Sequence, residues 1–377
     1  MKIQSIYLKN FRNYSNASAF FTKRLSFITG NNASGKTNLL EAISLLSHGK
    51  SFRGATDENM IEEGQSDYFI RGIFDKSGKK HEIEMGCDYS SGKLRRKIKL
   101  DSKVIPGRTA LVGNLISVVF SPSDIMIVEG GSSPRRRFLD LVISNQNQDY
   151  LKNLILYNRS LRQRNALLKK IKENKAHLKD LAAWDLGLSA YAEKITSSRN
   201  EFIETFHSIF QDSLRKISTS KDSITMKLKT AEGETDNNFL ESLKKNSMRD
   251  VRAGFTTIGP HRHSLNFTKN QRDITEFGSQ GQKRSLVLAL RIAQFYYLKK
   301  NLNLSPVLLI DDVIRELDAG RRSAFAGLLH ECGQAIFTTP DLDGMETFLK
   351  DMSESIEVFH IAEPGVIDRL ETSAENR

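Results

Sequence analysis

The segment 30–37, which reads GNNASGKT, constrains the fold of this chain more than any other part of the sequence. It fits the pattern G-x-x-x-x-G-K-[ST], follows a short apolar stretch at 25–29, and precedes leucines at helical spacing over 38–47. In such a strand–loop–helix, backbone N–H groups cradle nucleotide phosphates, Lys36 reaches the β- and γ-phosphates, and Thr37 offers Mg²⁺ a hydroxyl. We therefore predict a nucleotide-binding loop. Its expected residues are Gly30, Asn31, Asn32, Ala33, Ser34, Gly35, Lys36, Thr37 and Asn38.

A pair of carboxylates supplies the second half of such a site. Asp311 and Asp312 directly follow the apolar run Leu308–Ile310, as expected at the end of a buried strand. A strand in this position would deliver Asp311 to the Mg²⁺, so Thr37 and Asp311 are the expected metal ligands. Asp312 would then orient or deprotonate the attacking water. The predicted catalytic residues are Asp312, Lys36 and Asp311.

The positive charge of the chain is concentrated in two segments. Lys and Arg total 56 against 45 Asp and Glu, which gives a net charge of +11. The segment Lys93–Lys103 carries +5 and the segment Arg135–Lys175 carries +8. A single charged run is commonly a solvated face, but these two together exceed the charge of the whole chain. Localised charge of this kind favours a phosphate backbone as partner.

Several classes of protein are disfavoured by the sequence. The longest apolar runs, such as Leu286–Leu290, are far shorter than the roughly 20 residues of a membrane span. No apolar h-region precedes Lys9, so we expect no secretory signal. Only two cysteines occur, Cys87 and Cys332, which cannot build a disulfide scaffold. We expect a cytoplasmic protein without a membrane partner.

The expected secondary structure changes near Pro122 from mainly strands to mainly helices. On either side, strands are expected at 2–8, 69–74, 81–88, 95–100, 256–267, 306–310 and 332–338, and a helix at 281–299. From 135 to 217 the chain has no proline, and helical stretches are expected at 134–145, 149–174 and 178–216, followed by a polar loop at 227–234. We predict two parts: a discontinuous α/β head (1–120 and 255–377) and an inserted, mainly helical lobe with a basic arm (121–254).

Two further motifs resemble those of ABC-type ATPases. Ser279, Gln280, Gly281 and Gln282 resemble the signature loop of that superfamily, and Glu316-Leu317-Asp318 resembles its D-loop. The resemblance implies an ABC-type head with a mixed sheet and an antiparallel subdomain. It also implies that the signature loop of one subunit closes over ATP held by a second, so ATP and Mg²⁺ would be cofactors of a homodimer. Lys36 and Asp311 lie 275 positions apart, which leaves room for the inserted lobe.

The ordered set of motifs is similar to the RecF family. The matching segments run in order along nearly the whole chain: 8–14, 30–37, 50–53, 121–140, 259–262, 279–282 and 311–318. The resemblance implies a weak, Mg²⁺-dependent ATPase of recombinational DNA repair, linked to replication restart and the SOS response. It would clamp duplex DNA near single-strand gaps, with RecR and RecO as partners, and help to load the recombinase. A transporter or nuclease ATPase subunit is the alternative.

The expected DNA contacts are arginines of the inserted lobe. Backbone recognition of duplex or gapped DNA is favoured, since basic and aromatic residues do not interleave in the manner of single-strand binders. For the cluster 135–137, packing between lobes or at an interface stays open as an alternative. The predicted DNA-binding residues are Arg135, Arg136, Arg159, Arg162 and Arg164.

The histidine that ABC-type ATPases carry after the last strand of the head is absent, because the chain reads FTTP at 337–340.

Overall fold

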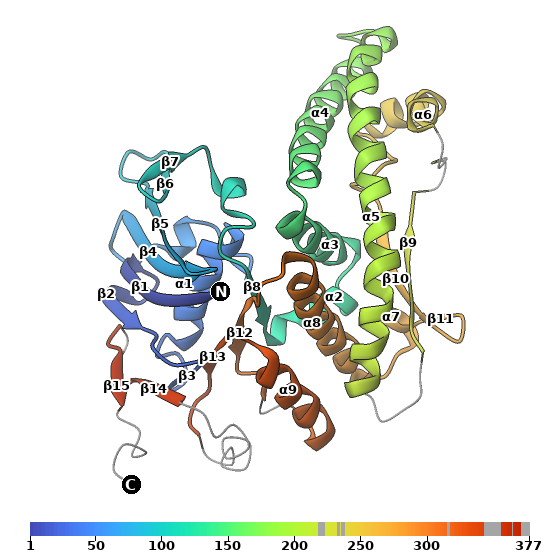
Figure 1. Cartoon of the computed structure of the whole chain (residues 1–377). Helices are drawn as coiled ribbons and strands as arrows, with labels where there is room; N and C mark the ends of the chain where they lie inside the picture. Colours follow the sequence, from blue (N-terminus) through green and yellow to red (C-terminus); the bar gives the residue numbers. More distant parts are fainter. Residues whose placement is uncertain are drawn as a thin grey trace. The chain divides into compact units, whose positions relative to one another are not determined.

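The chain folds as two units, each of which we describe by itself (Figure 1). A computed structural model describes residues 1–217, 223–231, 234, 238–314, 317–342, 356–363 and 365–370. The first unit contains residues 1–124 and the described chain from 288 onward, with the end of helix α5. The second contains 125–215 and the described residues up to 287. The first unit ends at 124, close to the predicted boundary at 120. The head was predicted to resume at 255, whereas the chain returns to the first unit at 288.

The first unit contains an antiparallel sheet with the strand order β2-β1-β4-β5-β6-β7. Its inward residues, such as Ile6, Leu8 and Ile70, are fully or almost fully buried, and alternate residues face outward. The predicted strands of the antiparallel subdomain are confirmed. Their bounds are β1 (Lys2–Phe11), β2 (Tyr14–Phe20), β4 (Asp67–Lys76), β5 (Lys79–Asp88), β6 (Arg95–Leu100) and β7 (Lys103–Ile105).

A second sheet in this unit is mostly parallel, with the order β15-β14-β3-β13-β12-β8. Its central strands are buried along their whole length, which is typical of parallel sheets covered on both faces. Phe27 and Phe337 stack across neighbouring strands, with ring centroids 4.5 Å apart. The strands are β3 (Leu25–Gly30), β8 (Ser117–Phe120), β12 (Val307–Asp311), β13 (Gln334–Thr338), β14 (Ile356–Ile361) and β15 (Asp368–Leu370).

Helix α1 (Lys36–His48) packs between these two sheets. Leu39, Leu40 and Ile43 are fully buried in a core that also includes inward residues of β1, β4 and β12. The loop 31–35 joins the end of β3 to the start of α1, so the core holds both ends of the strand–loop–helix predicted from the GNNASGKT segment. Helix α9 (Ala319–Glu331) also joins this unit, and its Phe325 meets Phe120 of β8 edge to face.

The second unit is built mainly from helices, as predicted. In Figure 1 the long helices α4 and α5 lie side by side, and Arg164 of α4 binds Asp185 of α5. The helix bounds are α2 (Met126–Glu129), α3 (Ser132–Gln146), α4 (Gln148–Lys172), α5 (Ala182–Ile217), α6 (Phe239–Ala253) and α7 (Ile274–Phe277). Helix α8 (Gln280–Leu302) begins in this unit and continues into the first.

A small antiparallel sheet in the second unit was not predicted. It consists of β9 (Thr225–Lys229), β10 (Ser264–Lys269) and β11 (Arg272–Asp273). The expected loop at 227–234 therefore begins as strand, and the expected strand at 256–267 starts only at 264. Gly259, with φ of +117°, and the following proline interrupt regular strand geometry there. Pairing with β9 explains why residues after 254 belong to this unit. Among the described helices, none is long and apolar enough to cross a membrane.

Candidate nucleotide-binding site

The GNNASGKT loop has the backbone geometry that a phosphate cradle needs. Gly30 and Gly35 have φ of +141° and +115°, a region that residues with a Cβ rarely adopt. A Cβ on Gly30 would clash with the backbone oxygen of Ile361, and one on Gly35 would lie 2.6 Å from Asn13 Nδ2. Asn31, Asn32 and Ala33 form the exposed tip of the loop. Both glycines are therefore required by local geometry.

The mouth of the loop has the donors that an anion would use. Lys36 Nζ donates to the carbonyl oxygens of Gly30 and Asn31, each at 2.7 Å. Burial lowers the pKa of Lys36, although the carboxylates of Asp312 and Asp311 partly offset this. The N-terminus of α1 has neither a side-chain cap nor an acidic residue in its first turn. The buried Ser34 hydroxyl has no hydrogen-bond partner among the described residues. These features fit a phosphate chain.

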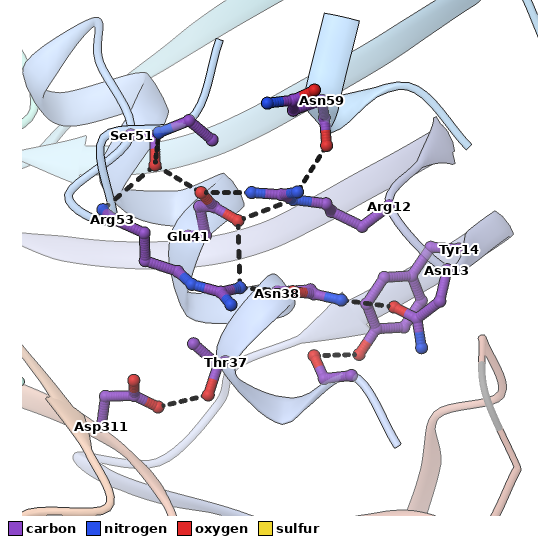
Figure 2. A network of polar contacts seen from close by, with 12 residues as sticks. Arg12, Asn13, Tyr14, Thr37, Asn38, Glu41, Ser51, Arg53, Asn59 and Asp311 are labelled. Atoms are coloured by element: carbon purple, nitrogen blue, oxygen red, sulfur yellow. Dashed lines mark hydrogen bonds and ion pairs between the residues drawn. The ribbon is translucent and has the colours of Figure 1, made fainter. Parts of the chain in front are cut away.

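The two predicted halves of the site meet at Thr37. Its Oγ1 donates to Asp311 Oδ1 over 2.7 Å, across 274 positions of sequence (Figure 2). Asp311 ends the buried strand β12 and is 6% exposed. Asp312 follows with φ of +51° and an exposed side chain. A hydroxyl and a carboxylate held in contact are suitable ligands for Mg²⁺.

The turn between β1 and β2 braces the loop, which the sequence did not predict. Asn13 Nδ2 donates to the Ser34 carbonyl at 2.8 Å, and Tyr14 Oη donates to the Gly35 carbonyl at 3.0 Å. Asn38 in turn donates to Asn13 Oδ1 at 2.8 Å. Burial raises the pKa of Tyr14 far above its ordinary value, which keeps its hydroxyl as a donor. Both residues lie in a segment that resembles the RecF family, but their spacing from the loop gives no signal of contact.

The buried carboxylate of Glu41 contacts side chains from several segments near the loop (Figure 2). Glu41 of α1 is fully buried and accepts two hydrogen bonds from Arg12, at 2.9 and 3.0 Å. It also accepts from the Ser51 hydroxyl, and Arg53 Nη1 lies 3.7 Å from it. Arg53 also donates to Asn38 Oδ1 at 3.0 Å. Residues from β1 and from the 51–53 segment are thus fixed to the helix that carries the loop.

The signature-like segment caps the start of α8 in the second unit. The Ser279 amide donates to Gln282 Oε1 at 2.9 Å, and the Gln282 amide donates back to Ser279 Oγ at 3.3 Å. This reciprocal pair is a capping box. Ser279, Gln280 and Gly281 are exposed and Gln282 is half-buried, while Gln280 donates to Glu129 at 3.1 Å. Of the D-loop-like segment, Glu316 lies outside the described residues, and Asp318 caps α9 by accepting from the Arg321 amide.

One predicted DNA contact is wrong. Arg164 is fully buried and binds Asp185 and Asp250, each at 2.6 Å. It also donates to Thr256 Oγ1 at 2.8 Å. Its position shares a helix face with Tyr157, Leu161 and Leu168, which are all buried, so the side chain points into the unit. A guanidinium with these partners is not available to a DNA phosphate.

The other four predicted DNA contacts form one exposed pair and one half-buried pair. Arg159 and Arg162 are exposed on α4. Arg135 and Arg136 are half-buried on α3 and donate to the carbonyls of Val128 and His263. Burial lowers the pKa of both. These contacts hold Arg135 and Arg136 within the second unit, so the exposed pair on α4 is the better candidate for DNA.

Comparison with known proteins identifies the family. The sequence model described as RecF/RecN/SMC N terminal domain matches residues 2–363. A curated relative from Leptospira interrogans, DNA replication and repair protein RecF, is 42% identical over 97% of this chain and 99% of its own. The chain belongs to the RecF family. A RecF from Agathobacter rectalis is 36% identical over 97% of this chain and 99% of its own.

A solved structure extends the RecF likeness to the fold. It is described as the recombination mediator protein RecF with ATP in the RecFOR pathway. It matches with a TM-score of 0.87 at 30% identity and covers 98% of both chains. The predicted ABC-type ATPase head with an additional lobe is therefore confirmed as the fold class. In that RecF structure the bound nucleotide is ATP.

Proposed function

We propose that this chain is an ATP-dependent DNA-binding protein of recombinational gap repair. It would form an ATP-driven dimer that clamps duplex DNA near single-strand gaps and helps to load the recombinase. The observation that carries the proposal is the contact of Thr37 with Asp311. It joins the loop to the aspartate pair in a chain that matches RecF over nearly its full length. That extent of match favours this function over a transporter or nuclease subunit.

The nucleotide chemistry follows from the residues at the loop. The loop amides, the Ser34 hydroxyl and Lys36 would bind the phosphates of ATP. Thr37 and Asp311 would hold Mg²⁺, which when bound neutralises phosphate charge. Asp312 would orient or deprotonate the attacking water. Its side chain is one methylene shorter than a glutamate, so we expect the water to be poorly held and hydrolysis to be slow.

Dimer closure would use the signature-like loop of one copy against the nucleotide of the other. The exposure of Ser279 and Gln280 supports this role. Because the Ser279 oxygen accepts from the Gln282 amide, its own proton is left to donate to a phosphate oxygen. The capping box fixes the direction of that hydroxyl before a second copy arrives.

Light scattering with ATP or ADP, with and without a gapped duplex, tests the proposal. We expect a dimer with ATP, a return toward monomer after hydrolysis, and tighter binding to gapped duplex than to free single strand. Ser279→Arg should leave ATP binding by the monomer intact. It should block the dimer, because the large arginine side chain would occupy the space in which this loop meets the nucleotide of the second copy. Ser91→Arg, at an exposed turn of the antiparallel sheet, is the matched control. An ATP-induced dimer of Ser279→Arg would refute the assignment of this loop.

DNA binding should depend on Arg159 and Arg162. Each phosphate contact contributes about −0.9 to the slope of log affinity against log salt. The double variant Arg159→Ala/Arg162→Ala should reduce that slope by about 2 and weaken binding to all sequences alike. Fluorescence anisotropy of a labelled gapped duplex at several salt concentrations measures both. Arg322→Ala, an exposed arginine of α9, should bind like the wild type. An unchanged slope in the double variant would exclude α4 as the DNA surface.

A further inference from the structure

The carboxylate of Asp311 is held by a second hydroxyl besides that of Thr37. Thr338 is the last residue of β13 and pairs with Asp311 in the parallel register of β12 and β13. Its Oγ1 donates to Asp311 Oδ1 at 2.8 Å, the same oxygen that accepts from Thr37 at 2.7 Å. Thr338 is 3% exposed. Rotation of the carboxylate would break both bonds at once, so the two hydroxyls together fix its orientation.

The same threonine also supports the backbone of Asp312. The Asp312 amide donates to the Thr338 carbonyl at 3.2 Å. Asp312 has φ of +51°, a left-handed conformation that aspartate adopts more readily than most residues with a Cβ. The hydrogen bond at this amide helps to hold the turn. Thr338 thus contacts both carboxylate residues, one through its side chain and one through its backbone.

The residues after Thr338 connect this end of the sheet to the phosphate loop. The Thr339 amide donates to the Ile28 carbonyl of β3, and the Gly30 amide donates to the Pro340 carbonyl, both at 3.1 Å. The segment 338–340 therefore binds the aspartate pair on one side and the start of the loop on the other. Movement of either half of the site would disturb hydrogen bonds of this segment.

We propose that Thr338 is a positioning residue that orients Asp311 for Mg²⁺ and holds the turn at Asp312. The proposal rests on the proposed function, in which Asp311 is a metal ligand. Thr37 can donate its proton to Asp311 and still offer a lone pair to Mg²⁺. A hydroxyl from Thr338 leaves that arrangement intact while it removes the freedom of the carboxylate. Groups that orient metal ligands in this way typically change metal affinity about 10- to 100-fold when they are removed.

Three single variants test the role of the Thr338 hydroxyl. Thr338→Val removes the hydroxyl and keeps the shape, and Thr338→Ser keeps the hydroxyl. Thr339→Val is the matched control, because Thr339 is 4% exposed and its hydroxyl donates to the Asp341 carbonyl instead. The measurements are the Mg²⁺ concentration for half-maximal binding of a fluorescent ATP analogue, and the affinity for Mn²⁺ by electron paramagnetic resonance.

We expect Thr338→Val to raise the half-maximal Mg²⁺ concentration about 10- to 100-fold, with Mn²⁺ affinity falling in parallel. ATP affinity in EDTA should stay unchanged, because Lys36 and the loop amides are untouched. Thr338→Ser and Thr339→Val should remain within about threefold of the wild type. In an Asp311→Asn background, Thr338→Val should have no further effect, since the two residues act through one contact.

The outcomes separate this proposal from the function on which it rests. A folded Thr338→Val protein with the wild-type Mg²⁺ midpoint overturns the role of Thr338 alone. A wild-type protein whose ATP binding is indifferent to Mg²⁺ overturns the metal role of Asp311 on which this proposal rests, while the ATP-induced dimer and DNA binding test the proposed function separately. Should Thr338→Val not fold, Thr338→Cys replaces it, since a thiol is a weak donor and should give an intermediate shift. A wild-type midpoint in Thr338→Cys would then count against the proposal.

Discussion

Lys36→Met should reduce ATP affinity by at least about 100-fold, because two or more charge-assisted hydrogen bonds of about 1.5–3 kcal/mol each would be lost. Lys36 is 8% exposed, and its ammonium donates to two carbonyl oxygens at the mouth of the loop. Burial lowers its pKa, so phosphate oxygens would replace solvation that the group lacks. Methionine keeps the length of the side chain without the charge.

The fold should survive Lys36→Met, because a buried cation is exchanged for an apolar chain. Equilibrium binding of a fluorescent ATP analogue gives the affinity, and circular dichroism reports the fold. Lys50→Met is the matched control, since this exposed lysine lies just beyond the end of the same helix. A folded Lys36→Met protein that binds ATP like the wild type would show that the loop does not hold the nucleotide.

Arg164→Met should destabilise the helical unit by about 3–5 kcal/mol, the typical cost of removing one partner from a buried ion pair. The variant would leave the carboxylates of Asp185 and Asp250, which are 5% and 0% exposed, without their cation. These contacts join α4 to α5 and α6, so the loss should be felt by all three helices.

Urea denaturation followed by tryptophan fluorescence measures this loss of stability. The chain has one tryptophan, Trp184, which is the neighbour of Asp185 on α5. Arg162→Met on the exposed face of α4 is the control and should change the free energy of unfolding by no more than about 0.5 kcal/mol. A loss below about 1 kcal/mol for Arg164→Met would contradict the structural role of this arginine.

The sequence predicted the elements whose determinants are local. The phosphate loop depends on two glycines, a lysine and a threonine between a strand and a helix, and all of these are adjacent in the chain. The long helices follow from apolar spacing without proline. The bounds of α4, Gln148–Lys172, differ little from the expected 149–174. Periodicity of this kind needs no knowledge of distant residues.

The features that were missed depend on distant parts of the chain. Thr338 contacts Asp311 across 27 positions, and Asn13 contacts Ser34 across 21, so no short motif announces either. Arg164 was expected on an exposed face because it lies in a basic run. Only the folded helix pair shows that two aspartates from other elements surround it. The strand β9 is short and lysine-rich, and its pairing with β10 decides its conformation.

The position of α1 between two sheets has a thermodynamic consequence for ligand binding. A helix fixed on both faces has already lost its conformational freedom in the free protein. The same holds for the turn at Asn13 and Tyr14, which is bonded to the loop backbone. The entropy cost of taking up a nucleotide therefore falls mainly on the exposed tip at Asn31, Asn32 and Ala33. Because helix α1 and the turn at Asn13 and Tyr14 are already ordered, less of the binding free energy is lost on nucleotide binding and the affinity is higher.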